Sequence, residues 1–236
     1  MPASALELNA LRKSYGGLRP LRVNELRVPA DRAVALLDLE AAAVEVLVNL
    51  VTGASLPDEG DVRIFERSTA SIESGDAWLA LLDRFGIVSE RVVLLEEMPI
   101  AQNLALPYTL ELDAIPPDVQ ARIDRIAAEV ALPPDALAVV AAQAPPEWRA
   151  RLRLARALAL NPELLLLEHP SVGLSPASST ALAATVRAVV EARGIAALII
   201  TADRAFADAA AHDVYSVQPA SGTVARTGGW RRWFGR

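Results

Sequence analysis

The chain has 236 residues, and its 23 basic side chains against 29 acidic ones give a net charge of −6. This acidic balance argues against general nucleic-acid binding, which needs a basic surface to neutralise phosphates. The absence of cysteine excludes disulfides and thiolate metal sites. No apolar run approaches the roughly 18 residues of a membrane span, and the N-terminus lacks the pattern of a secretory signal. We therefore expect a soluble, cytoplasmic protein that would reach a membrane only through a partner.

The first 88 residues predict short strands and helices in alternation. Residues 5–10 and 19–28 alternate in polarity around Gly16 and Gly17, which is typical of antiparallel strands joined by a turn. A continuous apolar run is typical of a buried strand, and the i, i+3, i+4, i+7 spacing within Val44–Val51 is typical of a helix. On these signals we expect strands at 33–37, 61–65 and 86–88 and helices at 41–51 and 77–82.

From about residue 89 to 160 the pattern changes to helices interrupted by prolines. We interpret this part as a helical lobe inserted into an α/β lobe of about 1–88 and 161–228. Beyond it we expect strands near 164–167, 196–201 and 213–218 and helices near 177–193 and 203–210. The predicted fold class is therefore α/β. It is a mixed sheet with an N-terminal antiparallel β subdomain and an inserted helical subdomain, together forming one domain over 1–228.

The run Leu164–Leu167 is apolar on both faces, which is typical of a central strand in a covered parallel sheet. Glu168 and His169 follow it directly. Because ligands of such sheets bind beyond the carboxyl ends of the strands, these two residues lie where a site would form. Together with the preceding Ala155-Arg-Ala-Leu158, this stretch resembles the Walker B region of ATP-binding cassette (ABC) ATPases.

The resemblance to the ABC family covers nearly the whole chain. The matching segments stand in the family's order, as Leu11-Arg-Lys-Ser-Tyr15-Gly-Gly, Val34-Ala-Leu-Leu37, Leu47–Gly53, Pro57–Arg63, Leu94-Leu95 and Asn103-Leu-Ala-Leu-Pro107. It implies a P-loop NTPase-like fold and a transporter-type cassette whose helical lobe docks on a membrane permease. It also makes Tyr15 a candidate for stacking on adenine, an interaction worth only about 1–3 kcal/mol.

The phosphate-loop position lacks the family motif. A G-x-x-x-x-G-K-[ST] loop offers backbone N–H groups, a lysine, and a hydroxyl for Mg²⁺. Here the lysine position is Val44 and the hydroxyl position is Glu45, while Asp38 and Glu40 add charge that repels a triphosphate. The alanines of this stretch favour helix, so we expect the helix to begin early, near Leu39, with Asp38 as its N-cap. By itself, Val44 is best read as an ordinary core residue.

The other positions that would handle ATP are replaced as well. The glutamine-loop position is Glu90, and the signature motif contains Pro145 and Pro146, which have no N–H to offer but suit the start of a helix. The metal-organising aspartate is replaced by Glu168 and the catalytic glutamate by His169, which can also be an ordinary solvated histidine. The switch histidine and the aspartate of the D-loop are replaced by Ala202 and Ser175.

Together these replacements predict no catalytic residue, no metal ligand and no cofactor. Losing even one such group typically costs orders of magnitude in rate. The leading hypothesis is a non-hydrolysing pseudo-cassette, a scaffold or regulator of a membrane transport complex. Its partner would be a permease, another cassette subunit or a second copy of the chain. Two alternatives stay open: an ATPase with residual or unusual activity that uses ATP and Mg²⁺ through Glu168 and His169, and a free-standing interaction protein.

Residues 229–236 form a basic-aromatic tail that contains Trp230-Arg-Arg-Trp-Phe234. Amphipathic aromatic and arginine side chains suit an anionic membrane surface or a protein partner. The alternative is an ordinary frayed terminus.

Overall fold

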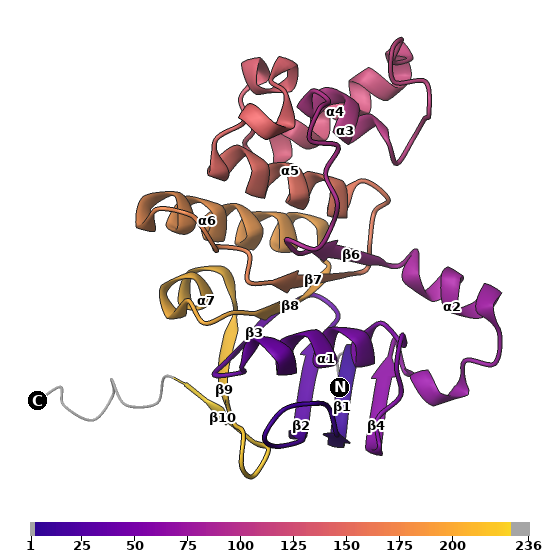
Figure 1. The fold of residues 1–236 in the computed structure, drawn as a ribbon, viewed down its shortest axis with the longest axis vertical. Helices are drawn as coiled ribbons and strands as arrows, with labels where there is room; N and C mark the ends of the chain where they lie inside the picture. The colour runs from indigo at the N-terminus through magenta and orange to yellow at the C-terminus, as the bar shows by residue number, and fades with distance from the viewer. Residues whose placement is uncertain (1–2, 228–236) are drawn as a thin grey trace, which may run out of the picture.

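The structure, a computed structural model, describes residues 3–227, and the expected tail at 229–236 lies outside them. Two β-sheets pack on either side of helix α1 (Ala41–Val51) (Figure 1). The first sheet is antiparallel, with strand order β2-β1-β4-β5. Its strands are β1 (Ser4–Lys13), β2 (Leu21–Pro29), β4 (Glu59–Ile64) and β5 (Arg67–Ser68). The predicted antiparallel pair at the N-terminus is therefore confirmed.

The second sheet has six strands in the order β10-β9-β3-β8-β7-β6, and only β10 pairs antiparallel to its neighbour. The strands are β3 (Ala33–Leu37), β6 (Phe85–Val88), β7 (Leu164–Glu168), β8 (Ala196–Ile200), β9 (Asp213–Gln218) and β10 (Thr223–Arg226). Along β7, Leu164 and Leu166 face α1, whereas Leu165 and Leu167 face the opposite helices. The strand is therefore apolar on both faces because both faces are covered, as predicted.

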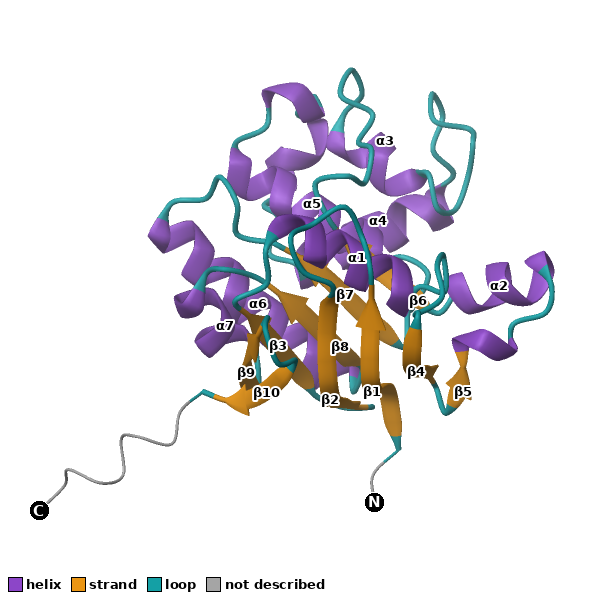
Figure 2. Ribbon diagram, turned by 60° about the horizontal axis from the view of Figure 1, so that its bottom comes forward, coloured by secondary structure: helices purple, strands orange, loops and turns teal. Residues whose placement is uncertain are grey.

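Helices cover the face of this sheet that lies away from α1. Those nearest the sheet are α5 (Pro146–Leu158), α6 (Pro176–Arg193) and α7 (Arg204–Ala210). Helices α3 (Ile100–Ala105) and α4 (Pro117–Glu129) lie beyond them with the short 3₁₀ turns Pro134–Ala138 and Ala141–Gln143. Helix α2 (Gly75–Leu82), preceded by the 3₁₀ turn Thr69–Ser71, projects to one side in both Figure 1 and Figure 2. None of the helices in residues 3–227 is long and apolar enough to cross a membrane.

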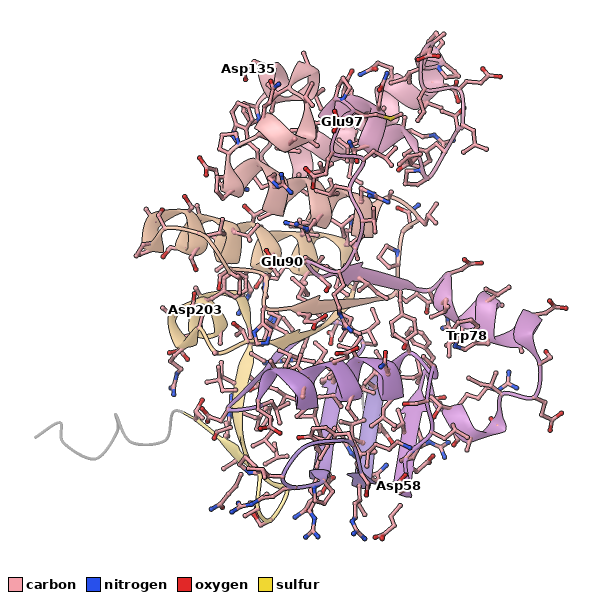
Figure 3. The ribbon with its side chains drawn as sticks, viewed as in Figure 1. Asp58, Trp78, Glu90, Glu97, Asp135 and Asp203 are labelled. Carbon is pink, nitrogen blue, oxygen red and sulfur yellow. The ribbon has the colours of Figure 1, made fainter. Side chains whose placement is uncertain are left out.

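The order of the strands determines which loops meet. Strands β6 and β7 are parallel neighbours, with Val88 opposite Leu167. The residues that follow them, Ser89–Arg91 and Glu168–His169, therefore emerge side by side at the carboxyl edge of the sheet. Figure 3 shows Glu90 where the chain leaves β6 toward α3. The segment between residues 89 and 160 thus begins next to the position predicted for a site and returns to the sheet at the opposite edge, before β7.

Candidate functional site

Two cavities at this edge bring several of the predicted site positions together. The larger measures about 410 Å³ and lies where the chain after β6, the start of α5 and the end of β7 meet. The sequence-predicted residues that line it are Glu90, Pro146, Glu168 and His169. The smaller measures about 300 Å³ and is lined by Tyr15 together with Asp38 and Glu40 of the phosphate-loop position.

A guanidinium occupies the space between two of the replaced positions. Arg91 Nη2 lies 2.7 Å from Glu168 Oε2, and its Nη1 lies 3.2 Å from Glu45 Oε1. Ser89 Oγ donates a second hydrogen bond to Glu168 Oε2 at 2.8 Å. The Glu168 side chain is only 13% exposed, against 45% for Arg91 and 59% for Glu45. A largely buried carboxylate requires a compensating charge and hydrogen-bond donors. Arg91 supplies the charge and Ser89 a donor, and together they offset the cost of burying Glu168.

The expected early start of the helix is wrong. Helix α1 begins at Ala41, and Glu40 stands at its N-cap without a side-chain capping bond in the described chain. Asp38 adopts a left-handed backbone, with φ of 67°, and its carboxylate accepts a hydrogen bond from Ser216 Oγ at 2.5 Å. A side chain held by β9 cannot turn back to the orphan N–H groups of α1. The tertiary contact therefore overrides the local capping preference.

Val44 lies inside the core and presents nothing to either cavity. Its side chain is 0% exposed and packs in the hydrophobic cluster that α1 shares with both sheets. The family resemblance predicts a lysine at this position, and a buried valine supplies no positive charge to the loop. Three carboxylates, from Asp38, Glu40 and Glu45, lie in or beside this loop. Arg91 pairs with Glu45, and Arg19 and Arg22 line the smaller cavity.

Tyr15 lines the smaller cavity, but its hydroxyl is engaged because it donates a hydrogen bond to Glu40 Oε1. Burial first, and then this carboxylate, raise the pKa of Tyr15 to about 12. A ring fixed in this way lies beside the phosphate-loop position. Its stacking on a base stays a prediction.

We expect Glu40→Gln to lower the pKa of Tyr15 toward its usual value of 10. An uncharged amide does not repel the phenolate, and it stabilises the protonated hydroxyl less than a carboxylate acceptor does. The pKa of Tyr15 in the folded chain lies above its usual value. The hydrogen bond from Tyr15 to Glu40 therefore contributes its full stabilisation below pH 10, and this stabilisation is lost as the pH rises toward 12. Ultraviolet titration of the phenolate measures the shift, and Tyr15→Phe identifies the signal. An unchanged titration curve in Glu40→Gln would contradict the role given to the carboxylate.

The remaining predicted positions serve local structure. Pro145 is the N-cap of α5 and Pro146 its first residue, which is the helix start that proline favours. Ser175 caps α6 by accepting a hydrogen bond from the N–H of Ser178 at 3.2 Å. His169 has a positive φ of 44°, its N–H donates to Ile200 O at 2.8 Å, and it lines the larger cavity.

Ala202 is exposed just after β8 and is followed by a residue that sequence reasoning did not single out. Asp203 caps α7 through the N–H of Phe206 at 3.0 Å (Figure 3). Its other carboxylate oxygen accepts hydrogen bonds from Ser171 and Ser179, both at 2.9 Å. These bonds lower the pKa of Asp203 although burial alone would raise it.

The sequence analysis also did not identify Arg91 and Ser89 as residues of this site. The one sequence signal for Arg91 was its position directly after Glu90, in a chain that has glutamates at the predicted metal positions 45 and 168.

The residues at this edge do not fit a nucleoside triphosphate with Mg²⁺ in the way that the family motif does. The position predicted for the lysine is a buried valine, and three carboxylates stand at or beside the loop. The two carboxylates at the metal positions, Glu45 and Glu168, are already paired with Arg91. We therefore derive no hydrolytic step from this geometry.

Comparison with solved structures defines the class of fold. No protein-family model matches the chain. The dimeric post-hydrolysis structure of the ATP-binding cassette MJ0796 bound to ADP and Pi superimposes with a TM-score of 0.76 at 18% identity, covering 95% of this chain and 100% of that one. The cbiO1 structure from Clostridium perfringens, part of the ABC transporter complex cbiONQ, gives 0.77 at 18% identity, over 94% of this chain and 87% of that one. The fold is thus that of a P-loop NTPase-like ABC cassette.

Sequence relatives settle the family. The lipoprotein-releasing system ATP-binding protein LolD of Alcanivorax borkumensis is 30% identical over 206 residues, which is 86% of this chain and 90% of LolD. The methionine import ATP-binding protein MetN of Brucella abortus is 27% identical over 201 residues, 84% of this chain and 53% of MetN. The chain belongs to the ABC transporter ATP-binding cassette family. It spans about half the length of MetN and of several other relatives.

The comparisons also correct one expectation. The sequence led us to predict that no cofactor is involved. The relatives contradict this, because LolD and MetN are named as ATP-binding proteins and the MJ0796 cassette was solved with ADP and Pi. The error came from equating the loss of the family's ligand residues with the loss of its ligand.

Proposed function

We propose that this chain is the cassette subunit of an ABC transport system, that its nucleotide is ATP, and that it keeps only residual ATPase activity. Its main role is then that of a scaffold or regulator on the transport complex. The observation that carries the proposal is the fully buried Val44 at the lysine position, inside a cassette fold that is otherwise retained. Without that lysine a triphosphate loses its principal cation, and binding and turnover become weak.

Family membership supports a membrane permease subunit as partner, together with a second cassette that is either a copy of this chain or another subunit. Such a subunit would work in the cytoplasm, at the inner face of the membrane, through the permease. The resemblance assigns the docking surface to the helices between residues 89 and 160. The methionine and lipoprotein systems of the relatives do not fix the cargo of this one, so the proposal stops at the transport complex.

The proposal is tested by measuring ATP hydrolysis of the purified chain beside the LolD relative under the same conditions. We expect a rate at least ~10³-fold below that of LolD, because several groups that position phosphate and water are replaced. The double variant Glu168→Gln with His169→Ala should remove the residual rate if it arises at this edge. A rate within about tenfold of LolD contradicts the proposal. So does the failure of any permease to co-purify with the chain when the chain is expressed together with its neighbouring genes.

A further inference from the structure

The larger cavity contains an arginine whose guanidinium has no partner in the described chain. Arg153 belongs to α5 and lines this cavity of about 410 Å³. Its Nε is buried without a hydrogen-bond partner, and its side chain forms no hydrogen bond or ion pair with residues 3–227. Because a buried polar group that lacks a partner costs free energy, this arginine requires an explanation.

The other arginines of α5 show that the lack of a partner is specific to one position. Arg149 binds the carboxylate of Glu96, at 2.6 and 2.9 Å. Arg151 and Arg156 donate hydrogen bonds to backbone carbonyls, at 2.7 and 2.6 Å. Of the four arginines of this helix, Arg153 alone makes no such bond within residues 3–227. Its planar set of donors is therefore available to a ligand in the cavity.

One face of α5 forms the wall that carries Arg153. Pro146, Arg149 and Ala150 line the cavity with it, and the i, i+3, i+4, i+7 spacing of these four residues places them on one side of the helix. The remaining walls come mainly from residues 88–90, after β6, and 168–173, after β7. A ligand bound to Arg153 would therefore contact both the helix and the edge of the sheet.

The charges of the lining favour a ligand with a single negative charge. Glu168 and Arg149 line the cavity, but each is already held in an ion pair. The permanently charged side chains that remain are Arg153 and the exposed Glu90. One carboxylate can accept two hydrogen bonds from a guanidinium, whereas the second charge of a phosphate would also be repelled by Glu90.

The rest of the lining is mostly apolar and includes Val88, Ala144, Pro170 and Val172. A cavity of a few hundred cubic ångströms with an apolar lining and a few polar anchors is typical of a small-molecule site. We propose that this cavity binds a small amphipathic monocarboxylic acid. Its carboxylate pairs with the guanidinium of Arg153, and its hydrocarbon part lies against the apolar wall.

This binding goes beyond the transport role proposed above. Among the described residues, none of the phosphate-loop position at 38–45 lines the larger cavity, whereas Asp38 and Glu40 line the smaller one. The acid would therefore bind without nucleotide. Because it contacts α5 and the loops that follow β6 and β7, it would hold the helix against the edge of the sheet.

The experiment titrates hexanoate into the full chain without nucleotide and follows binding by ligand-observed nuclear magnetic resonance. We expect a Kd of about 1 mM, as for a small ligand with one good ion pair. Arg153→Gln should weaken binding at least about tenfold. Arg156→Gln is the matched control and should leave it unchanged, because neither Arg156 nor its partner Val93 lines the cavity. Hexanamide, which has the same shape without the charge, should also bind at least about tenfold more weakly than hexanoate.

Should Arg153→Gln fold poorly, Arg153→Lys serves instead. Lysine keeps the charge but loses the paired donors, so a loss of about threefold is expected. A thermal shift gives a second readout, because hexanoate should raise the melting temperature of the unmodified chain and of Arg156→Gln but not of Arg153→Gln.

Four results overturn the proposal. They are no binding of hexanoate up to about ten times the expected Kd, equal affinity in a folded Arg153 variant, equal affinity for hexanamide, and tighter binding of inorganic phosphate. The first result would make Arg153 an ordinary solvated arginine. The titration contains no ATP and no permease. Its failure is therefore distinguishable from a failure of the proposed transport function, which is judged by turnover and co-purification.

Discussion

Val44→Lys is expected to lower the free energy of unfolding by about 3–5 kcal/mol instead of restoring a phosphate site. The Val44 side chain is 0% exposed and packs among apolar side chains of α1 and of both sheets. An ammonium at this position would lose its hydration without a buried partner. Restoring the family's lysine alone therefore places a charge in the core, because the loop around it no longer turns that side chain toward a ligand.

Val44→Ala is the matched control, because it removes apolar contacts without adding a charge. We expect it to cost about 1–3 kcal/mol, clearly less than the lysine variant. Urea unfolding followed by circular dichroism gives both values, and ATP titration by calorimetry shows whether the lysine improves binding. If Val44→Lys proves as stable as Val44→Ala and binds ATP more tightly, the loop retains the family's geometry and our description of it is incorrect.

The elements around Val44 show what local sequence can establish. The strand at 33–37 and the helix at 41–51 have the predicted bounds, because an apolar run and an i, i+3, i+4, i+7 spacing are local signals that burial then reinforces. The residues between them were misjudged. Asp38 is bonded to Ser216, which lies 178 positions away in the sequence, and no local pattern reports such a contact. Strand β10 was not predicted, because its four residues, three of them exposed, carry no clear pattern.

The candidate site shows the same limit. The family resemblance predicted which positions are replaced, including Glu45 and Glu168, because the matching segments run in the family's order along the chain. It could not show that Arg91 joins them, since that contact depends on β6 and β7 being neighbours in the sheet. The fold therefore places the predicted replacements Glu45 and Glu168 in contact with one arginine.

Asn103→Ala is expected to lower the free energy of unfolding by about 2–3 kcal/mol. The side chain is 0% exposed and makes four hydrogen bonds to backbone groups. Its Oδ1 accepts from the N–H of Leu95 at 2.8 Å. Its Nδ2 donates to the carbonyls of Leu95, Met98 and Pro99, at 3.0, 3.3 and 3.2 Å. Truncation would leave the N–H of Leu95 without its partner, and an unsatisfied buried donor costs about 1–3 kcal/mol. The three carbonyls would each lose one hydrogen bond but keep a backbone N–H donor.

The neighbouring amide gives the control. Gln102 Nε2 donates a single hydrogen bond, to Leu112 O at 3.0 Å, so Gln102→Ala should cost only about 0.5–1.5 kcal/mol. The segment that Asn103 fixes also carries Glu96, whose carboxylate binds Arg149 of α5 at 2.6 and 2.9 Å. Losing Asn103 should therefore increase amide hydrogen exchange at residues 95–99 and at the start of α5, where the proposed permease surface lies. Equal stability losses in the two variants, or unchanged exchange in Asn103→Ala, would show that the buried amide does not fix this segment.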